Sequence, residues 1–349
     1  MTAPQRVYHL ALRETHAEAG ARFHERLGWS LPAHYGDAEA EYAALRGAAV
    51  LLDQSHRSRF IVHGPDALEV LAGAFAGDLR ALEEGRALRT AWLDADGLIT
   101  DVALVARTGG IAYFVSGEPG QREATAARLR GALGPGYEAT IDDRTESTCL
   151  LALTGPAAAE VARAHLDQAL SPRLRQLEAV TFQFHGFRSL AVRTSDSGED
   201  GFEMMLAPAV AQHVVQTLRE AGVALAGDIA REAARVETCI PAYSPDLEGG
   251  LTPGEAGLHD LLGIPGGRRR RCLVALLLDA LTALPAGTRL TGAALEGELR
   301  SCVRAFGLDA IAALAVLGGG DPPPPGTTLD AAGNRATIVA KPLYRRRTA

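Results

Sequence analysis

The chain of 349 residues has few cysteines, and the four at positions 149, 239, 272 and 302 form no CxxC pair or Cys/His cluster. This excludes a disulfide-dense secreted domain and a cysteine-based zinc site, because both need closely spaced cysteines. We expect no bound metal. Long apolar runs are also missing, since none approaches the roughly 18 residues of a membrane-spanning helix. The first residues lack the pattern of a signal peptide, so we expect a cytoplasmic protein.

An excess of basic charge is likewise missing. The 35 Lys and Arg residues are outnumbered by 42 Asp and Glu residues, and the two signs are interspersed along a chain of net charge -7. Such a balance gives no support for a nucleic-acid partner or a membrane surface. The one basic run, residues 268–271, has no interleaved aromatic residues, and we expect a solvated loop there. A small-molecule substrate or a protein partner is therefore favoured.

The chain does contain enough apolar residues, 47%, for a sizeable core, and its length predicts more than one domain or lobe. Up to about residue 262, strand patterns alternate with helical ones, which is typical of α+β lobes. We expect helices at 15–28, 38–47, 67–75, 122–133, 209–221 and 227–240. From about residue 263, short strands separated by loops predict a small β-rich C-terminal domain.

One carboxylate stands within an apolar strand, GLITDVALV, at residues 97–105. Side chains alternate along a strand, so Asp101 shares a face with Ile99, Ala103 and Val105. A buried, ionised carboxylate is costly unless a ligand or a basic group pairs with it, and burial raises its pKa. The pattern alone fits two interpretations, a functional carboxylate or an Asp that caps a neighbouring turn.

A second candidate acid follows the glycine-rich bend at residues 195–201. The strand behind this bend puts Phe202, Met204 and Leu206 on one face, so Glu203 lies on the other face near the bend. That position offers a fixed hydrogen-bond acceptor beside a loop with room for a ligand. The alternative is a solvated Glu on a half-exposed strand.

Two arginines lie on one face of the helix predicted at 227–240. Asp228 is placed to cap this helix, so Arg231 falls in its first turn and Arg235 one turn later. Arginine has a planar fork suited to a carboxylate or an amide edge. A solvated pair of arginines is the alternative.

These groups occur in the order of a known family. Residues 16–56 contain a helical segment, Gly-Trp, Tyr-Gly-Asp and Asp-x-Ser-His, and RFIVHGPDALEVLAG, LITD, LALTGP, SGEDGFE, AGDIARE and RVETCIPAYSPDLE follow. The ordered set resembles the aminomethyltransferase family, which includes the glycine-cleavage T-protein and its folate-binding relatives. The resemblance implies an α+β fold, a three-lobed disc around a central pocket with a C-terminal β-barrel-like domain. It divides the chain into a discontinuous folate-binding domain (1–52 and 148–262), an α+β domain carrying Asp101 (53–147) and the C-terminal domain (263–349).

The resemblance also implies tetrahydrofolate in that pocket, with one-carbon chemistry at its N5 and N10 atoms. Asp101 matches the family's carboxylate beside these nitrogens, Glu203 its pterin-anchoring Glu, and Arg231 the Arg of its Ala-Arg-Asp helix. A carboxylate fits the amino and ring N–H donors of a pterin. Asp101 would orient the cofactor and stabilise positive charge on the amine. Further candidate cofactor-binding residues are Glu199, Tyr113 and Val115.

Departures from the family pattern concern the folate tail and carrier docking. Thr100 replaces the first acid of a two-acid motif, and Asp196 stands where the family usually has Tyr. The family's segments after Leu258 are missing, including the cysteine motif of its iron-sulfur branch. An Arg common near the C-terminus corresponds to Ala332, with Arg335 as the nearest substitute.

The predicted function is a tetrahydrofolate-dependent one-carbon transferase of the aminomethyltransferase or small-molecule demethylase type, with Asp101 assisting the chemistry. A lipoyl carrier protein is a possible partner. Two alternatives remain open. One is a folate-independent enzyme of specialised metabolism that uses Asp101 as acid or base, and the other is a non-catalytic folate-binding accessory protein.

Overall fold

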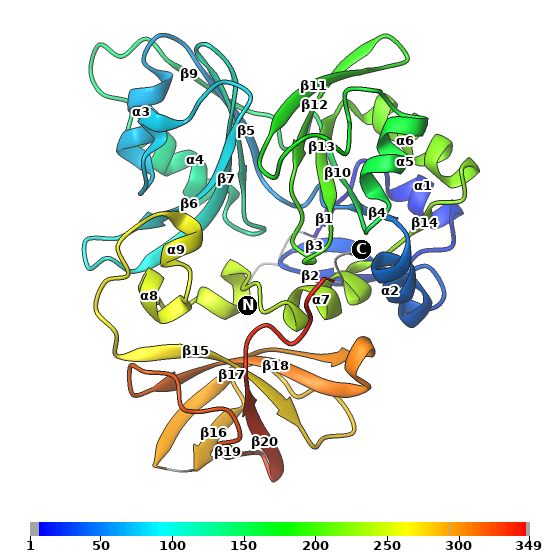
Figure 1. Cartoon of the computed structure of the whole chain (residues 1–349). Helices are drawn as coiled ribbons and strands as arrows, with labels where there is room; N and C mark the ends of the chain where they lie inside the picture. Colours follow the sequence, from blue (N-terminus) through cyan, green and yellow to red (C-terminus); the bar gives the residue numbers. More distant parts are fainter. Residues whose placement is uncertain (1–6, 293, 347–349) are drawn as a thin grey trace, which may run out of the picture.

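Two large sheets stand side by side above a separate barrel (Figure 1). These elements are described for residues 7–292 and 294–346 of a computed structural model. The first large sheet has the order β11(Ala179–Phe184), β12(Phe187–Arg193), β13(Gly201–Leu206), β10(Cys149–Thr154), β4(Val50–Asp53) and β14(Ala224–Leu225). The second has the order β6(Ala87–Leu93), β7(Ile99–Gly109), β8(Ala112–Gly117), β5(Arg59–His63) and β9(Thr140–Asp143).

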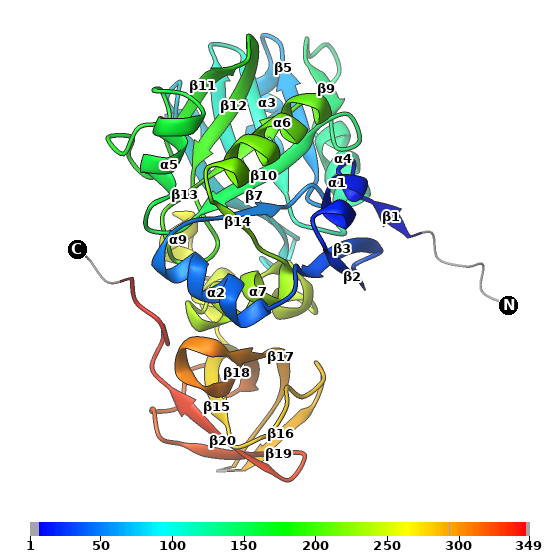
Figure 2. The same ribbon diagram turned by 90° about the vertical axis from the view of Figure 1, so that its right-hand side faces the viewer.

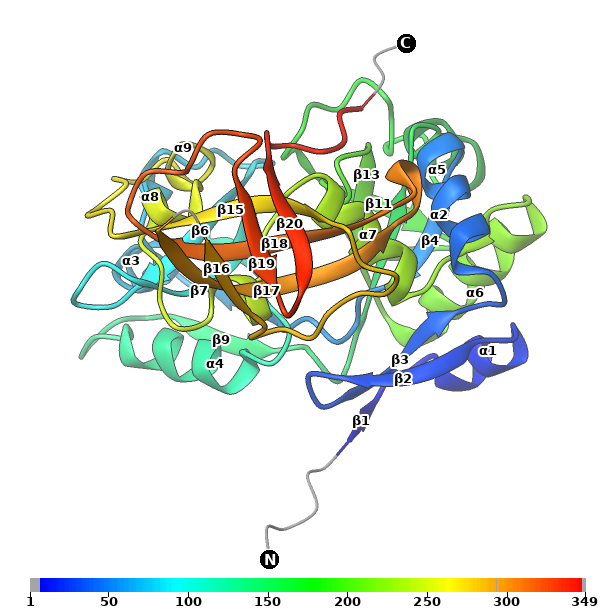
Figure 3. The ribbon, with the colours of Figure 1, turned by 90° about the horizontal axis from the view of Figure 1, so that it is seen from below.

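The barrel closes because its first and last strands pair antiparallel. Its order is β15(Arg271–Leu278), β18(Ala310–Gly318), β17(Leu295–Ala305), β16(Arg289–Gly292), β19(Thr328–Ala331) and β20(Asn334–Val339). Figure 3 shows the barrel from below, in front of the remaining elements. A small sheet near the N-terminus has the order β1(Tyr8–His9), β3(Trp29–His34) and β2(Arg22–Arg26). The α+β class and the C-terminal barrel predicted from the sequence are confirmed.

Helices cover the outer faces of the large sheets and fill the space above the barrel (Figure 2). Each large sheet has its own apolar core, and a third cluster joins the two sheets through residues such as Leu104, Phe114 and Val192. The helices are α1(Arg13–Glu18), α2(Ala38–Gly47), α3(Ala67–Ala74), α4(Arg122–Gly131), α5(Ala158–His165), α6(Pro208–Glu220), α7(Asp228–Glu237), α8(Pro253–Ala256) and α9(His259–Leu262), with short turns η1(Leu79–Ala81), η2(Tyr243–Leu247) and η3(Phe306–Leu308).

Two local predictions are wrong. Helix α1 ends at Glu18, and residues predicted to continue it form β2, whose pairing with β3 outweighs their helical propensity. Asp228 does not cap α7. Gly227 is the N-cap, and the Asp228 carboxylate instead accepts hydrogen bonds from Arg26 of β2 at 2.9 Å.

The described helices are too short or too polar to cross a membrane. The basic run at residues 268–270 is an exposed loop, as predicted, and Arg271 begins β15. The division of the chain into three domains stays a prediction.

Candidate functional site

A cavity of about 350 Å³ lies where both large sheets meet α7 and α9. Gln176 and Leu261 are exposed and mark its mouth, while Arg57, Glu118 and Asp196 are buried and mark its floor. The remaining lining residues come from both sheets, α7, α9 and the loops between them: Arg89, Val102, Ala103, Leu177, Thr194, Ser195, Gly198, Glu199, Arg231, Arg235, Ile240, Pro241, Ala242, Leu258 and Leu262.

Asp101 is not among the residues that line the cavity, although its neighbours Val102 and Ala103 are. Its side chain is 2% exposed. One carboxyl oxygen accepts a hydrogen bond from Thr125 Oγ1 of α4 at 3.0 Å, and Nη1 of Arg128 lies 3.9 Å from the same oxygen. Burial, and next the negative charge of Glu118, raise the pKa of Asp101 to about 8. With such a pKa, Asp101 is mainly protonated at neutral pH. Its other carboxyl oxygen accepts a hydrogen bond from the Val102 N–H at 2.8 Å, and a functional role for Asp101 stays a prediction.

The raised pKa links the ionisation of Asp101 to folding. In the unfolded chain this carboxyl loses its proton near pH 3.8, whereas in the fold it keeps the proton to about pH 8. The folded state binds more protons between these values, so its stability falls as the pH rises through them. We expect urea denaturation to show Asp101→Asn gaining stability relative to wild type from pH 5 to pH 8. Asp260→Asn, at an exposed position, is the control. If the difference in unfolding free energy between Asp101→Asn and wild type stayed constant across this pH range, Asp101 would not have a raised pKa in the fold.

Glu203 of β13 is 2% exposed, and neither of its carboxyl oxygens has a hydrogen-bond partner among the described residues. The alternative prediction, a solvated Glu203 on a half-exposed strand, is therefore wrong. A buried acceptor without a donor is costly, so we expect this carboxylate to gain a partner from water, an ion or a ligand. Glu203 is not among the residues that line the cavity.

Arg57 connects the groups around the cavity floor. It lies 3.0 Å from Glu118, and its Nε atom is buried without a hydrogen-bond partner in the described part of the chain. Burial alone would lower the pKa of Arg57, but the charges of Glu118, Glu203, Asp196 and Asp101 raise it. Arg57 therefore interacts electrostatically with both predicted functional acids, Asp101 and Glu203.

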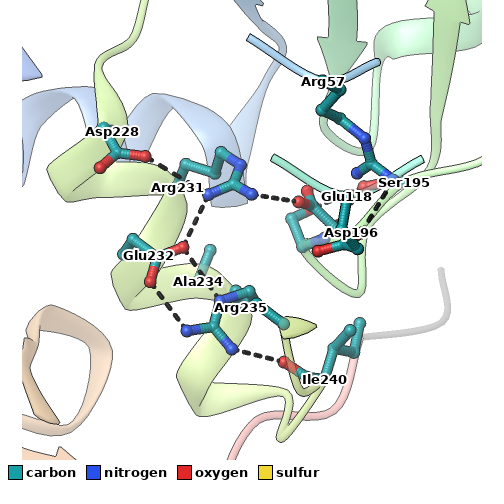
Figure 4. Close-up of polar contacts among 12 residues, drawn as sticks. Arg57, Glu118, Ser195, Asp196, Asp228, Arg231, Glu232, Ala234, Arg235 and Ile240 are labelled. Carbon is teal, nitrogen blue, oxygen red and sulfur yellow. Dashed lines mark hydrogen bonds and ion pairs between the residues drawn. The ribbon is translucent and has the colours of Figure 1, made fainter. Parts of the chain in front are cut away.

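Figure 4 shows Arg231 extending from α7 toward the cavity floor. Its Nη2 atom lies 3.1 Å from Asp196 Oδ2, and its Nη1 atom contacts Asp228 and Glu232. Burial alone would raise the pKa of Asp196, but Arg231, Arg57 and Arg89 lower it below its ordinary value. The cavity floor therefore contains an ionised carboxylate, Asp196, at the position where the resemblance would place Tyr.

Glu199 lines the cavity, but its carboxylate is already paired. It lies 3.2 Å from Arg46 of α2 and accepts a hydrogen bond from Tyr344 at 2.5 Å. Gly198 precedes it with φ +80°, and a Cβ atom there would lie 2.3 Å from Thr238. The bend therefore requires glycine at position 198, and Glu199 fixes this bend against α2 and the C-terminal segment.

Tyr113 and Val115 do not line the cavity. Both are buried in the core between the second sheet and helices α3 and α4, together with Phe60 and Leu129. Their strand alternation turns them away from Phe114, which faces the other sheet. They contribute to packing in this structure, and their assignment as cofactor contacts stays a prediction.

The sequence interpretation did not single out Arg57, Glu118 or Arg89, although all three line the cavity. Arg57 directly follows the Asp-x-Ser-His motif, and this adjacency was the only available signal. Arg335, the nearest C-terminal arginine to Ala332, pairs with Asp279 at 2.6 Å and is 67% exposed on the barrel. It is not part of the cavity.

Comparison with known proteins gives a consistent result. The family model of the GCVT N-terminal domain matches residues 12–264. An aminomethyltransferase of Streptomyces avermitilis is 32% identical over 254 residues, which cover 72% of this chain and 68% of the relative. One from Thermus thermophilus is 35% identical over 236 residues, 68% of this chain and 67% of the relative. One from Moorella thermoacetica is 28% identical over 355 residues, 95% of this chain and 96% of the relative.

The fold also resembles a solved structure, the glycine cleavage system aminomethyltransferase T from Bartonella henselae. The two superpose with a TM-score of 0.86 over 98% of this chain and 99% of the other, at 24% sequence identity. This likeness confirms the predicted overall fold.

Proposed function

Because the chain belongs to the aminomethyltransferase family, we propose that it is a tetrahydrofolate-dependent one-carbon transferase. The observation that carries this proposal is the buried Glu203 carboxylate, whose two oxygens have no donor among the described residues. The donor carries its one-carbon unit on a heteroatom, as a carrier-bound aminomethyl group or a small methylated amine does.

Tetrahydrofolate would supply the amines N5 and N10 that accept the one-carbon unit. Glu203 would bind the pterin N–H donors. The guanidinium groups of Arg57 and Arg231 would balance the negative charges of Glu118 and Asp196 at the cavity floor. Asp101, protonated at neutral pH, would donate its proton to the amine that leaves the one-carbon donor, and the carboxylate that remains would stabilise positive charge on the folate amine. Val102, Leu258 and Leu262 would keep water from the reacting atoms.

Glu203→Gln is expected to weaken tetrahydrofolate binding by about 10-fold or more, because one oxygen is replaced by a donor that opposes the pterin N–H groups. Isothermal titration of wild type and variant measures this. Exposed Glu160→Gln is the matched control and should bind like wild type. Equal affinities and equal kinetics for wild type and Glu203→Gln would show that Glu203 does not anchor the pterin.

The same titration tests the function itself. No binding of tetrahydrofolate by wild type at near-millimolar concentration would overturn the transferase proposal and favour a folate-independent enzyme. Binding without transfer from any one-carbon donor, whether carrier-bound or a small methylated amine, would favour an accessory protein.

A further inference from the structure

Arg128 of α4 lies beside the buried carboxyl group of Asp101 without forming a hydrogen bond to it. Its Nη1 atom is 3.9 Å from Asp101 Oδ2, the oxygen that accepts the hydrogen bond from Thr125 Oγ1. Thr125 and Arg128 are three positions apart on one face of α4, so both side chains reach the same oxygen. Asp101 forms no other ion pair with the described residues.

The guanidinium group of Arg128 is held in place, but its donors are only partly used. Its Cζ atom lies 5.0 Å from the ring centroid of Trp92, which pairs with Asp101 across strands β6 and β7. Nη2 donates a long hydrogen bond of 3.4 Å to the Thr100 carbonyl, and Nη1 is buried without a hydrogen-bond partner among the described residues. A buried donor without an acceptor is costly, so we expect Nη1 to gain a partner from water or from a nearby group. Asp101 becomes a strong acceptor when it loses its proton.

Four charged or titratable groups act on Asp101 from the elements around it. The carboxylate of Glu118, directly after β8, opposes the ionisation of Asp101, and Arg128 of α4 favours it. Arg57, just before β5, and Tyr243 of η2 also interact electrostatically with Asp101. Arg57 is already paired with Glu118 at 3.0 Å. Arg128 has no other carboxylate partner in the described part of the chain, so its charge remains for ionised Asp101.

We propose that Arg128 is a positioning residue that moves onto the Asp101 carboxylate when Asp101 gives up its proton. The inference rests on the proposed function, in which that proton passes to the amine that leaves the one-carbon donor. The O–H bond of Asp101 breaks, an N–H bond forms on the amine, and the electron pair stays on the carboxylate. Arg128 keeps its own protons and stabilises this anion through charge-assisted hydrogen bonds. Its side chain is partly exposed, which gives it room to move.

The movement is tested on wild type without any ligand. Crystal structures at about pH 6 and about pH 9.5 lie on either side of the pKa of about 8 for Asp101. At the higher pH, the separation between Arg128 Nη1 and Asp101 Oδ2 should shorten from 3.9 Å to about 2.9 Å, the length of a charge-assisted hydrogen bond. The same separation at both pH values would overturn the inference.

Arg128→Gln removes the charge and should make Asp101 harder to ionise. The alkaline fall of kcat, where Asp101 loses the proton that it must donate, should move up by about one pH unit, because an opposite charge at this distance favours the ionised form. The plateau of kcat should fall about 10-fold with little change in KM, because the anion that forms after proton transfer is less stable. Arg128→Lys should keep most of the wild-type profile.

The control is Arg130→Gln, which removes the same charge from an exposed position on α4. Its pH profile should match that of wild type. A lower melting temperature of Arg128→Gln with an unshifted alkaline fall of kcat would assign Arg128 to structure alone and overturn the inference, while the proposed function would stand. No turnover by wild type with any one-carbon donor would overturn the proposed function, and the two crystal structures would still decide whether Arg128 pairs with ionised Asp101.

Discussion

Asp101→Asn is expected to lower turnover of the one-carbon donor by about 100-fold or more while the fold stays intact. Asparagine has nearly the shape of the protonated carboxyl and can keep the hydrogen bond to Thr125. It cannot release or take up a proton. Steady-state kinetics measure turnover, and thermal melting reports on the fold.

Asp260→Asn is the matched control for turnover, because the Asp260 side chain is 95% exposed and does not line the cavity. It should have wild-type kinetics. A lower melting temperature for Asp101→Asn together with unchanged turnover would contradict a chemical role and assign Asp101 to structure.

Arg235→Met is expected to lower the free energy of unfolding by about 3–5 kcal/mol, because it leaves the buried Asp246 carboxylate without its cation. Arg235 is 1% exposed and donates to Asp246 at 2.6 Å and to Ser301 of the barrel at 2.8 Å. These contacts tie α7 to η2 and to β17. Urea denaturation measures the change.

Arg163→Met is the control for Arg235→Met, because Arg163 forms an exposed pair with Glu160 and such pairs contribute little. The double variant Arg235→Met/Asp246→Leu should recover part of the lost stability, since it removes the uncompensated charge as well. A single-variant loss no larger than that of the control would show that this network does not stabilise the junction.

The sequence pattern predicted correctly those helices whose ends are specified by residues of the same segment. Helix α2 begins at Ala38 and ends at Gly47, as predicted, because Asp37 caps it through its own side chain. The predicted helix at 15–28 was wrong because β2 forms by pairing with β3, a contact that local propensity does not contain. Strand β17 was not predicted, because its many polar residues obscure the strand pattern; its hydrogen bonds come from pairing with β16 and β18.

The sequence alone was enough to establish the family, through the order of its motifs, and to reduce the candidate acids of the two-acid motif to Asp101. It also placed Arg231 on the helix that reaches the cavity. Contacts that exist only after folding supplied the rest: the unpaired oxygens of Glu203 and the pair between Arg231 and Asp196. Burial and ion pairing depend on distances between residues far apart in the chain, and those distances are set when the two sheets pack against α7.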